Sequence, residues 1–358
     1  MSSQPLITTV IPTYQRPNML RRAIRSVLDQ TYPHFKICVY DNASNDETGE
    51  VVSAMASRDS RIRYHRHPTN IGAQDNFIFG LSQVDTPLVH LISDDDFLLP
   101  GFFAQATSAL NKHPSVAFFS GGMLSADPDG RVRALVCYGS KADQVYRPAQ
   151  LFQLLAPYTR TWTSAIFRRT ALEAVGGLKK ETGYSFSIDL ILRLATRVEA
   201  VLSDAPCAVF TVHPGSSSVA GACEAFESLL TLGFFESVNE AIDSARKDKL
   251  VTDHDAAGMK SLFRATTEWV LFRGAFGMIA RGQRPVALRA SRVLAESFDQ
   301  KAMAAMIRVA TMDHKIGSPF RLALSTVRSA RGLWFGKAKC SRYSVYSEVV
   351  RDRMLQLV

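Results

Sequence analysis

Residues Leu91 to Gly101 read LISDDDFLLPG, so three consecutive carboxylates, Asp94, Asp95 and Asp96, stand between two apolar runs. Adjacent like charges repel each other, and a core strand has no use for them. The residues just before them, PLVHLIS, form an apolar run with the character of a buried strand. We therefore expect the three aspartates at the end of a core strand, on the rim of a sheet.

The N-terminal part of the chain alternates between strand-like and helix-like patterns. Short apolar runs predict strands at 6–12, 36–41, 61–67, 87–93 and 116–122, with helical spacing between them. This alternation predicts βαβ units and a mostly parallel sheet, in which ligands bind outside the carboxyl ends of the strands. Asp41 and the three aspartates all lie at such ends.

The C-terminal part has a different character. From about residue 225 the strand signals stop and helical periodicity continues. The net charge of +9 is concentrated there, because residues 281–358 hold 15 Lys and Arg against 5 Asp and Glu. A basic helical region indicates an anionic partner, such as a membrane surface, a nucleic acid or a phosphorylated substrate.

Composition excludes several classes of protein. The hydrophobic content of 46% is ordinary for a globular protein, and no window of about 18 residues is both apolar and uncharged. The first ten residues lack the basic and apolar segments of a signal peptide. The five cysteines are far apart and include no C-x-x-C pair, which argues against a disulfide framework. We expect a cytoplasmic protein, with peripheral contact to the inner membrane face as a further hypothesis.

Clustered carboxylates on a loop bind hard cations such as Mg²⁺ or Mn²⁺ through oxygen. Such a metal neutralises a diphosphate and the negative charge that develops as the phosphate departs. The alternative is a solvated acidic turn that caps the next helix, where Asp is favoured. The buried strand before the aspartates and the independent Asp41 favour the metal site.

Four motifs, in their order and spacing, carry a family resemblance. VIPTYQRPNMLRRAIRSVLDQTY, ICVYDNASNDET, NIGAQDNF and LISDDDFLLPGF resemble the nucleotide-sugar half of family 2 glycosyltransferases of the GT-A fold. A weaker match continues to HPGSSS, and nothing beyond about residue 225 contributes. The resemblance implies an α/β fold with a Rossmann-like, mostly parallel mixed sheet flanked by helices. The catalytic domain would span 1–224, with a nucleotide-sugar-binding half at 1–122 and an acceptor half at 123–224. The basic helical region would span 225–358.

The resemblance implies roles for residues on the donor side. Pro12, Thr13 and Tyr14 match the segment that lines the nucleotide pocket. Asp41 matches the residue that accepts a hydrogen bond from the base, which suits the N–H of uracil or thymine. Arg16 is either a residue near the phosphates or a surface arginine at the start of a helix.

The acidic motif itself has three implied roles. Asp94 matches a carboxylate near the ribose or metal, Asp95 the principal metal ligand, and Asp96 the last acid of the motif. Asn70 and Asn76 match the family's N-x-G segment, or serve as turn and cap residues.

An inverting transfer needs a carboxylate that takes the proton of the acceptor hydroxyl. The family commonly places it in an acidic pair before a helix that reads SIDLILRL here, and that position is Ser187. Asp189 is therefore the candidate base, and its alternative role is the N-cap of the helix. Glu181, in the loop GGLKKETGYS, is the second candidate.

Two further residues are candidates by resemblance and by type. His213, in VHPGSSS, is placed to contact the diphosphate or metal, or else it is a structural histidine. Trp162, in TRTWTSA, is either a stacking platform for an acceptor sugar or a core tryptophan.

Residues 318–337, SPFRLALSTVRSARGLWFGK, have an apolar helical face and an arginine-bearing one. The pattern is typical of a helix that lies in a membrane interface and equally of a helix packed on the catalytic domain.

The resemblance, together with the acidic motif, implies a metal-dependent, inverting transferase that uses a UDP- or dTDP-sugar in polysaccharide, O-antigen or glycolipid assembly. The acceptor would be a saccharide or lipid-linked saccharide. A degenerate protein that serves as a scaffold, and sugar transfer in secondary-metabolite biosynthesis, are the alternatives. The turn PTYQRP lacks the G-x-G-x-x-G of dinucleotide-binding enzymes, and no nucleic-acid-binding module is present.

Overall fold

A ten-stranded mixed sheet forms the centre of the computed structural model, which describes residues 6–138, 144–157, 162–216, 222–312 and 343–357. The strands are β1 (Ile7–Thr13), β2 (Phe35–Asp41), β3 (Ile62–Arg66), β4 (Leu88–Leu91), β5 (Phe97–Leu98), β6 (Phe118–Ala126), β7 (Val132–Val136), β8 (Gln144–Tyr146), β9 (Ala165–Arg168) and β10 (Ala200–Thr211). The order is β3-β2-β1-β4-β9-β6-β10-β5, with β7 beside β6 and β8 beside β10. Strands β1 to β4 pair in parallel, whereas β9 is antiparallel to both of its neighbours. All five strands that the sequence predicts are present.

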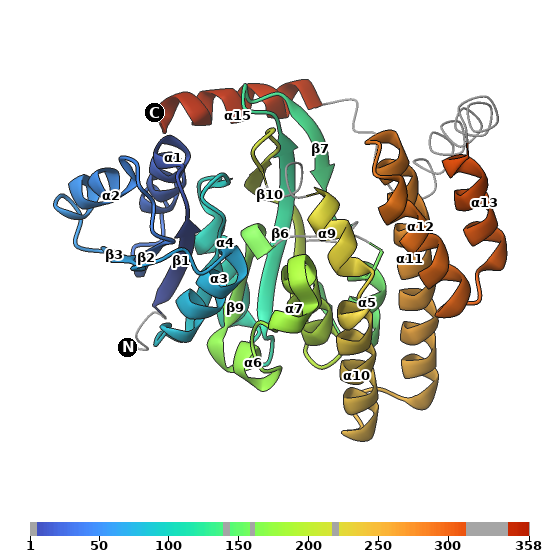
Figure 1. The fold of residues 1–358 in the computed structure, drawn as a ribbon. Helices are drawn as coiled ribbons and strands as arrows, with labels where there is room; N and C mark the ends of the chain where they lie inside the picture. Colours follow the sequence, from blue (N-terminus) through green and yellow to red (C-terminus); the bar gives the residue numbers. More distant parts are fainter. Residues whose placement is uncertain (1–5, 139–143, 158–161, 217–221, 313–342, 358) are drawn as a thin grey trace.

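Helices cover both faces of the sheet (Figure 1). One apolar cluster joins the sheet to α1 (Pro17–Leu28), α2 (Thr48–Ala56) and α4 (Phe102–Lys112). A second joins it to α3 (Ala73–Ser82), α5 (Pro148–Leu155), α6 (Arg169–Ala174) and α7 (Phe186–Ala195). Two 3-10 segments, η1 (Trp162–Ser164) and η2 (Lys180–Ser185), lead into β9 and α7. The expected mixed α/β fold is confirmed.

The side chains of β1 show how alternation produces the two layers. Ile7 and Ile11 belong to the cluster under α1, and Val10 belongs to the cluster on the opposite face. Side chains two residues apart point to the same face of a strand, so one strand contributes to both cores. The helical stripe of α1 is completed by Leu20 and Ile24, which are fully buried.

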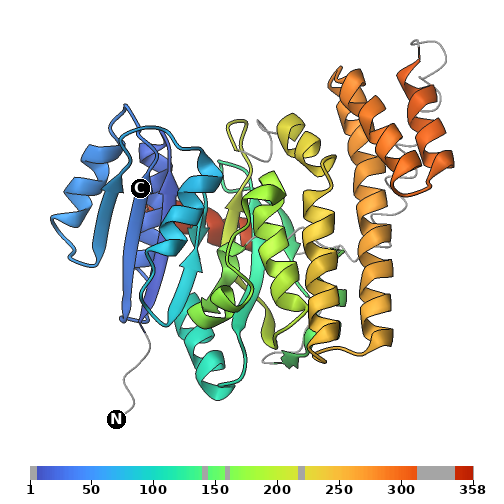
Figure 2. The same cartoon turned by 60° about the horizontal axis from the view of Figure 1, so that its bottom comes forward.

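The C-terminal region is helical throughout its described residues. It consists of α9 (Ala222–Leu229), α10 (Gly233–Lys247), α11 (Asp253–Ala280), α12 (Arg284–Glu296), α13 (Lys301–Thr311) and α15 (Tyr343–Gln356). Helices α10 to α13 lie beside the sheet, on the side away from β1 to β3 (Figure 1, Figure 2). Within the described ranges, no helix combines the length and apolarity needed to cross a bilayer. Residues 318–337, the predicted interfacial helix, lie outside the described residues.

Helix α15 returns to the sheet (Figure 1). Val350 and Leu357 pack with Phe97, the residue that follows the three aspartates. Arg353 forms an ion pair of 3.1 Å with Asp29, just after α1. The helix therefore supports the sheet from behind the acidic loop.

Gly122 in β6 is expected to be intolerant of a side chain. A Cβ there would lie 2.7 Å from the backbone oxygen of Asp204 and 3.1 Å from that of Ala205, in the irregular pairing of β6 with β10. Gly122→Ala should therefore destabilise the protein by about 1–3 kcal/mol in urea unfolding. Gly258→Ala is the matched control, because Gly258 is in α11 with open space around it; it should raise stability by about 0.5–1 kcal/mol. Equal midpoints for the two variants would contradict the prediction.

Candidate active site

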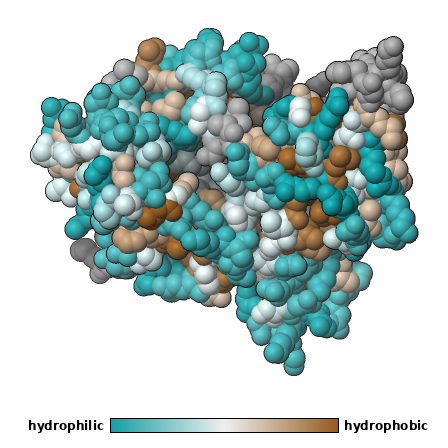
Figure 3. Space-filling view, viewed as in Figure 1, coloured by the Kyte–Doolittle hydropathy of each residue, from teal (hydrophilic) through white to brown (hydrophobic). Residues whose placement is uncertain are grey.

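A cavity of about 1280 Å³ opens at the carboxyl ends of β1 and β4. Its sheet side is lined by Pro12, Thr13, Tyr14, Arg16, Asp94 and Asp95. Its opposite side consists of residues from η2, α7, α9 and α12, among them Tyr184, Ser187, Glu224 and Val293. In the space-filling view hydrophobic residues gather where α9, α11 and α12 meet (Figure 3). The cavity thus joins the predicted donor residues to a wall from the C-terminal region.

Asp94 connects the acidic loop to the end of β1. Its Oδ2 accepts hydrogen bonds from the Thr13 hydroxyl at 2.7 Å and from the Tyr14 backbone N–H at 3.3 Å. Its Oδ1 faces Nη1 of Arg16 at 3.0 Å. Sequence positions about 80 residues apart therefore meet at one carboxylate, as the predicted parallel pairing requires.

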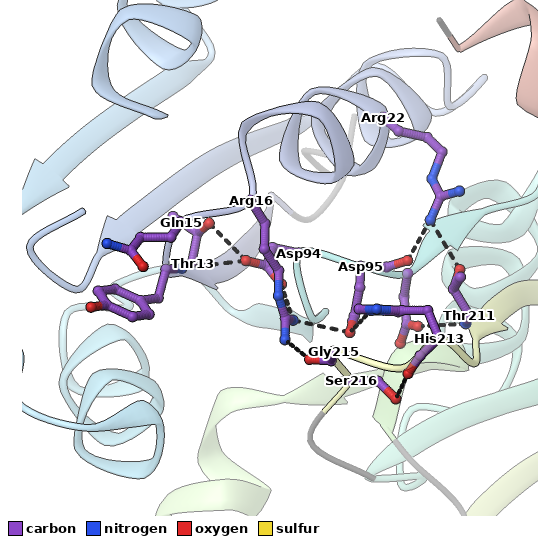
Figure 4. Close-up of polar contacts among 12 residues, drawn as sticks. Thr13, Gln15, Arg16, Arg22, Asp94, Asp95, Thr211, His213, Gly215 and Ser216 are labelled. Carbon is purple, nitrogen blue, oxygen red and sulfur yellow. Dashed lines mark hydrogen bonds and ion pairs between the residues drawn. The ribbon is translucent and has the colours of Figure 1, made fainter. Parts of the chain in front are cut away.

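Asp95 lies between two cationic or potentially cationic groups (Figure 4). Its Oδ2 is 3.1 Å from Nη1 of Arg16 and 3.1 Å from Nε2 of His213. Arg16 also donates from Nη2 to the backbone oxygen of Gly215. The structure thus brings together Asp94, Asp95, Arg16 and His213, four residues that the sequence singles out.

Asp96 differs from the expectation that it faces a metal. Its carboxylate is fully buried and is not part of the cavity lining. Oδ1 accepts from the Thr211 backbone N–H at 3.0 Å, and Oδ2 accepts from the Thr163 hydroxyl at 2.8 Å. Because protein donors occupy both oxygens, the observed arrangement favours a structural role that ties the acidic loop to β10 and η1.

Arg22 is a site residue that sequence reasoning missed. It donates from Nη2 to the Asp95 backbone oxygen and, at 3.0 Å, to the Thr211 hydroxyl (Figure 4). Its guanidinium lies 4.7 Å from the ring centre of Phe97. The only signal in the sequence is an arginine off the apolar stripe of α1, which resembles a solvent-exposed residue.

The predicted base-binding region has a different geometry from the one expected for Asp41. The carboxylate of Asp41 is fully buried. It accepts hydrogen bonds from the Ser44 backbone N–H at 2.9 Å and from the Tyr64 hydroxyl at 2.6 Å. The neighbouring Asn42 lines the cavity instead and donates to Asn70 at 2.8 Å. Asn76 lines the cavity too. A role for Asp41 in binding a base stays a prediction.

Of the two residues predicted to act on the acceptor, Trp162 lines the cavity and Asp189 does not. Trp162 lines the cavity and packs on Phe186, with ring centres 5.4 Å apart, while only 3% exposed. Asp189 is fully buried and is not among the lining residues. Its Oδ2 is 2.7 Å from Nε of Arg193, one turn along α7. Burial raises the pKa of Asp189, although Arg193 acts against that rise.

Two further acidic residues, both candidates for the general base, lie on or near the cavity side formed by η2, α7, α9 and α12. Ser187, the position where the family usually has an acid, lines the cavity, and Glu181 is exposed but is not among the lining residues. Glu224 was not predicted. It lines the cavity, is exposed, and makes no hydrogen bond or ion pair within the described part of the chain. The helix that contains Glu224, α9, packs against η2. Ser228 of α9 accepts a hydrogen bond from the backbone N–H of Tyr184 in η2 at 3.2 Å.

The donor set of the acidic loop fits a hard divalent cation. Among the described residues no three His, Cys, Asp or Glu side chains cluster as a complete metal site. Asp94 and Asp95 do offer carboxylate oxygens on the cavity wall, and His213 lies next to Asp95. Mg²⁺ and related ions are often held by one or two carboxylates and completed by substrate phosphates, so two carboxylates suffice.

Burial is the main electrostatic feature of the loop. Burial, followed by the charge of Asp95, raises the pKa of Asp94 to about 6, although Arg16 and Thr13 act in the opposite direction. The same two causes, burial first, raise the pKa of Asp96 well above its ordinary value.

Comparison with known proteins shows similarity to glycosyltransferases. Residues 8–176 match the family model described as Glycosyl transferase family 2. The GalNAc(5)-diNAcBac-PP-undecaprenol beta-1,3-glucosyltransferase of Campylobacter jejuni is 31% identical over 109 residues, which are 30% of this chain and 35% of that enzyme. Chondroitin synthase of Pasteurella multocida is 22% identical over 53% of this chain and 19% of that enzyme. The chain covers less than two thirds of the length of these relatives.

Solved structures show the fold. S. aureus TarS 1–349 gives a TM-score of 0.61 at 13% identity, over 98% of this chain and 91% of that one, and is also known with UDP-GlcNAc. The mannosyltransferase PcManGT of Pyrobaculum calidifontis, in complex with GDP-Man and Mn²⁺, gives a TM-score of 0.51 at 17% identity, over 99% and 86% of the two chains. The sheet order and its flanking helices are those of the fold that TarS and PcManGT share. Residues 8–176 are thus similar to glycosyl transferase family 2, and the chain has the GT-A fold.

The raised pKa of Asp94 predicts a pH-dependent stability. In the unfolded chain this carboxyl titrates near pH 4, whereas in the folded protein it titrates near pH 6. Between these values the folded state holds a proton that the unfolded chain has released, so the free energy of unfolding contributed by this group falls as pH rises. A pKa difference of about 2 corresponds to roughly 3 kcal/mol.

Asp94→Asn should therefore lose stability relative to wild type at pH 4.5 and regain it by pH 7. Urea unfolding of the ligand-free proteins across this range measures the difference. Asp129→Asn, on an exposed turn, is the matched control. Parallel curves for wild type and Asp94→Asn would contradict the prediction.

Proposed function

We propose that this protein is a glycosyltransferase that transfers a sugar, with inversion, from a nucleoside-diphosphate sugar to an acceptor hydroxyl. The observation that carries the proposal is that two sets of residues line one cavity. Arg16, Asp94 and Asp95 belong to the first set, and Trp162 and Glu224 belong to the second. Such a cavity accommodates both substrates, which the reaction requires in contact.

The donor would bind along the sheet edge. Pro12, Thr13, Tyr14 and the amide groups of Asn42 and Asn70 line the nucleotide end, and Arg16 lies where it could reach a diphosphate. TarS is known in complex with UDP, and we take a UDP- or dTDP-sugar as the favoured donor here. Asp41 would act on the base indirectly, by holding the Ser44 turn, or directly after giving up a present partner.

A divalent cation, Mn²⁺ or Mg²⁺, would be held by Asp95 and Asp94 with His213 next to them. When bound it would neutralise the diphosphate of the leaving group. Asp96 would contribute by fixing the loop, because Thr163 and Thr211 occupy its carboxylate.

The bond changes follow from this placement. An acceptor oxygen bonds to the anomeric carbon from the side opposite the phosphate, the bond from that carbon to the phosphate oxygen breaks, and its electron pair leaves with the nucleoside diphosphate. The proton of the acceptor hydroxyl passes to a carboxylate. The negative charge that develops on the departing diphosphate would lie near Arg16, whose planar guanidinium suits a phosphate.

Two carboxylates are candidates for that proton. Asp189 would first have to leave Arg193, and breaking a buried ion pair costs several kcal/mol. Glu224 lies on the cavity wall without a protein partner among the described residues. Its helix packs on η2, which leads to Ser187. These differences favour Glu224 as the base and a structural role for Asp189.

The acceptor is proposed to be a saccharide or lipid-linked saccharide in the assembly of a bacterial polysaccharide or glycolipid. Trp162, which lines the cavity, would contact an acceptor sugar. The C. jejuni relative's name specifies an undecaprenol-linked substrate, which supports a location at the inner membrane face. Contact through residues 318–337 stays a hypothesis from the sequence alone. A degenerate scaffold protein remains the competing proposal, since Ser187 replaces the usual acid.

A thermal-shift panel tests the donor proposal. With Mn²⁺ present, UDP or dTDP should raise the melting temperature, since a ligand that binds only the folded state stabilises it by mass action. GDP and NAD should have little effect, and Asp95→Asn should lose the Mn²⁺-dependent part of the shift. Asp129→Asn, away from the cavity, is the control. No shift with any nucleotide would reject the donor site and favour the scaffold.

Substitution of the two candidate carboxylates tests the base. Glu224→Gln should lower kcat by about 10²–10⁴-fold, measured as release of nucleoside diphosphate from the donor that responds in the panel, with the thermal shift retained. Ser187→Asp in the same background should restore part of the rate, because it supplies a carboxylate on the same wall. Asp189→Asn should instead lower the unfolding midpoint. A full loss of kcat in a normally stable Asp189→Asn protein, with Glu224→Gln active, would return the base to Asp189.

A further inference from the structure

We propose that Arg16 is a transferable cation: it neutralises Asp94 and Asp95 in the ligand-free protein and passes to the donor diphosphate when a divalent metal takes the carboxylates. The inference rests on the proposed function and deepens it. It assigns to one residue the coupling between metal binding and nucleotide binding.

The first support is the position of the guanidinium. Nη1 of Arg16 lies 3.0 Å from Oδ1 of Asp94 and 3.1 Å from Oδ2 of Asp95, between the two adjacent carboxylates (Figure 4). Nη2 of the same group donates to the backbone oxygen of Gly215. A positive group held by two carboxylates and a carbonyl has the partners that a bound cation would have.

The second support is the charge of the loop without that group. The carboxylates of Asp94 and Asp95 are 6% and 9% exposed, and two neighbouring buried negative charges strongly oppose each other's ionisation. Arg22 is the other arginine nearby, and it contacts the backbone oxygen of Asp95 rather than a carboxylate. Arg16 is therefore the arginine that neutralises these two carboxylates directly.

The third support is mutual exclusion. Oxygen ligands of Mg²⁺ lie at about 2.0–2.1 Å, so the oxygens that face Nη1 at about 3 Å cannot hold both cations in the same place. A guanidinium and a divalent ion would also repel each other strongly at that range. Arg16 therefore competes with a metal for Oδ1 of Asp94 and Oδ2 of Asp95.

The fourth support is the place to which Arg16 can move. It is the N-cap residue of α1, so its backbone is anchored, and its side chain is 27% exposed and lines the cavity. The planar fork of an arginine matches phosphate oxygens in pairs. A diphosphate that enters with the metal gives Arg16 a new anionic partner, whereas metal alone leaves it without one.

This exchange predicts positive coupling between the two ligands. In wild type, Mn²⁺ alone should bind weakly, since it must displace Arg16, and UDP should tighten Mn²⁺ binding. Thermodynamic linkage requires Mn²⁺ to tighten UDP binding by the same factor.

Arg16→Gln removes the competing cation and tests the inference. Its affinity for Mn²⁺ in the absence of nucleotide should rise by about tenfold or more, while its affinity for UDP at saturating Mn²⁺ should fall by a similar factor. The free Mn²⁺ signal in electron paramagnetic resonance measures the first, and titration calorimetry measures the second. The opposite signs of the two effects distinguish exchange from a general disturbance of the site, which would weaken both.

Two further variants complete the experiment. Arg16→Lys keeps the charge without the fork, so it should retain weak Mn²⁺ binding and still lose UDP affinity. Arg21→Gln is the matched control in α1, because the only side-chain hydrogen bond of Arg21 among the described residues is to Asn18. This variant should behave as wild type.

The outcomes separate the two proposals. Unchanged or weaker Mn²⁺ binding by Arg16→Gln, in a protein whose wild type binds Mn²⁺ with UDP, overturns the exchange alone. A wild type that binds neither ligand rejects the donor site, and the exchange with it.

Discussion

The proximity of two buried carboxylates, those of Asp94 and Asp95, is the constraint on which the site depends. A sheet edge that places them side by side needs compensating positive charge, and helix α1 supplies it from two positions. Arg16 at its start neutralises the carboxylates on the cavity side. Arg22, about a turn and a half further, holds the backbone beneath them and bonds to Thr211. The same helix that packs on β1 therefore sets both the charge and the shape of the acidic loop.

The third aspartate explains how the loop is kept rigid. Asp96 is placed under the sheet edge, where Thr163 and Thr211 satisfy both of its oxygens. These two donors come from later in the chain, one from η1 and one from the end of β10. His213 follows β10 by two residues and so reaches Asp95. The acidic loop is thus the point at which residues 1–122 and residues 123–224 are joined by these contacts.

The helical C-terminal region takes part in the site rather than standing apart from it. Helices α9 and α12 complete the cavity wall, and α15 packs behind the acidic loop through Val350 and Leu357. Because α9 packs against η2, Glu224, which follows the residues matched by the family model, lies on the cavity wall. That placement offers a physical reason why an acid at position 187 could be dispensable.

The sequence by itself determined the α/β order of elements, the strand ends that hold Thr13 and Asp94, and the helical nature of the C-terminal region. Those features follow from local periodicity and from the rule that parallel strands gather their carboxyl ends at one edge. It also singled out Asp95, Arg16 and His213, since their residue types and motif positions are visible without a fold.

Only the tertiary structure decided the direction of the side chains and their partners. Three adjacent aspartates look equivalent in a sequence, yet backbone direction sends Asp96 inward and leaves Asp94 and Asp95 on the cavity. Arg22 and Glu224 carry no local signal, because one is buried by a turn of α1 and the other is brought across the cavity by packing between regions distant in the chain. Partner and burial depend on contacts between elements, which local sequence patterns do not encode.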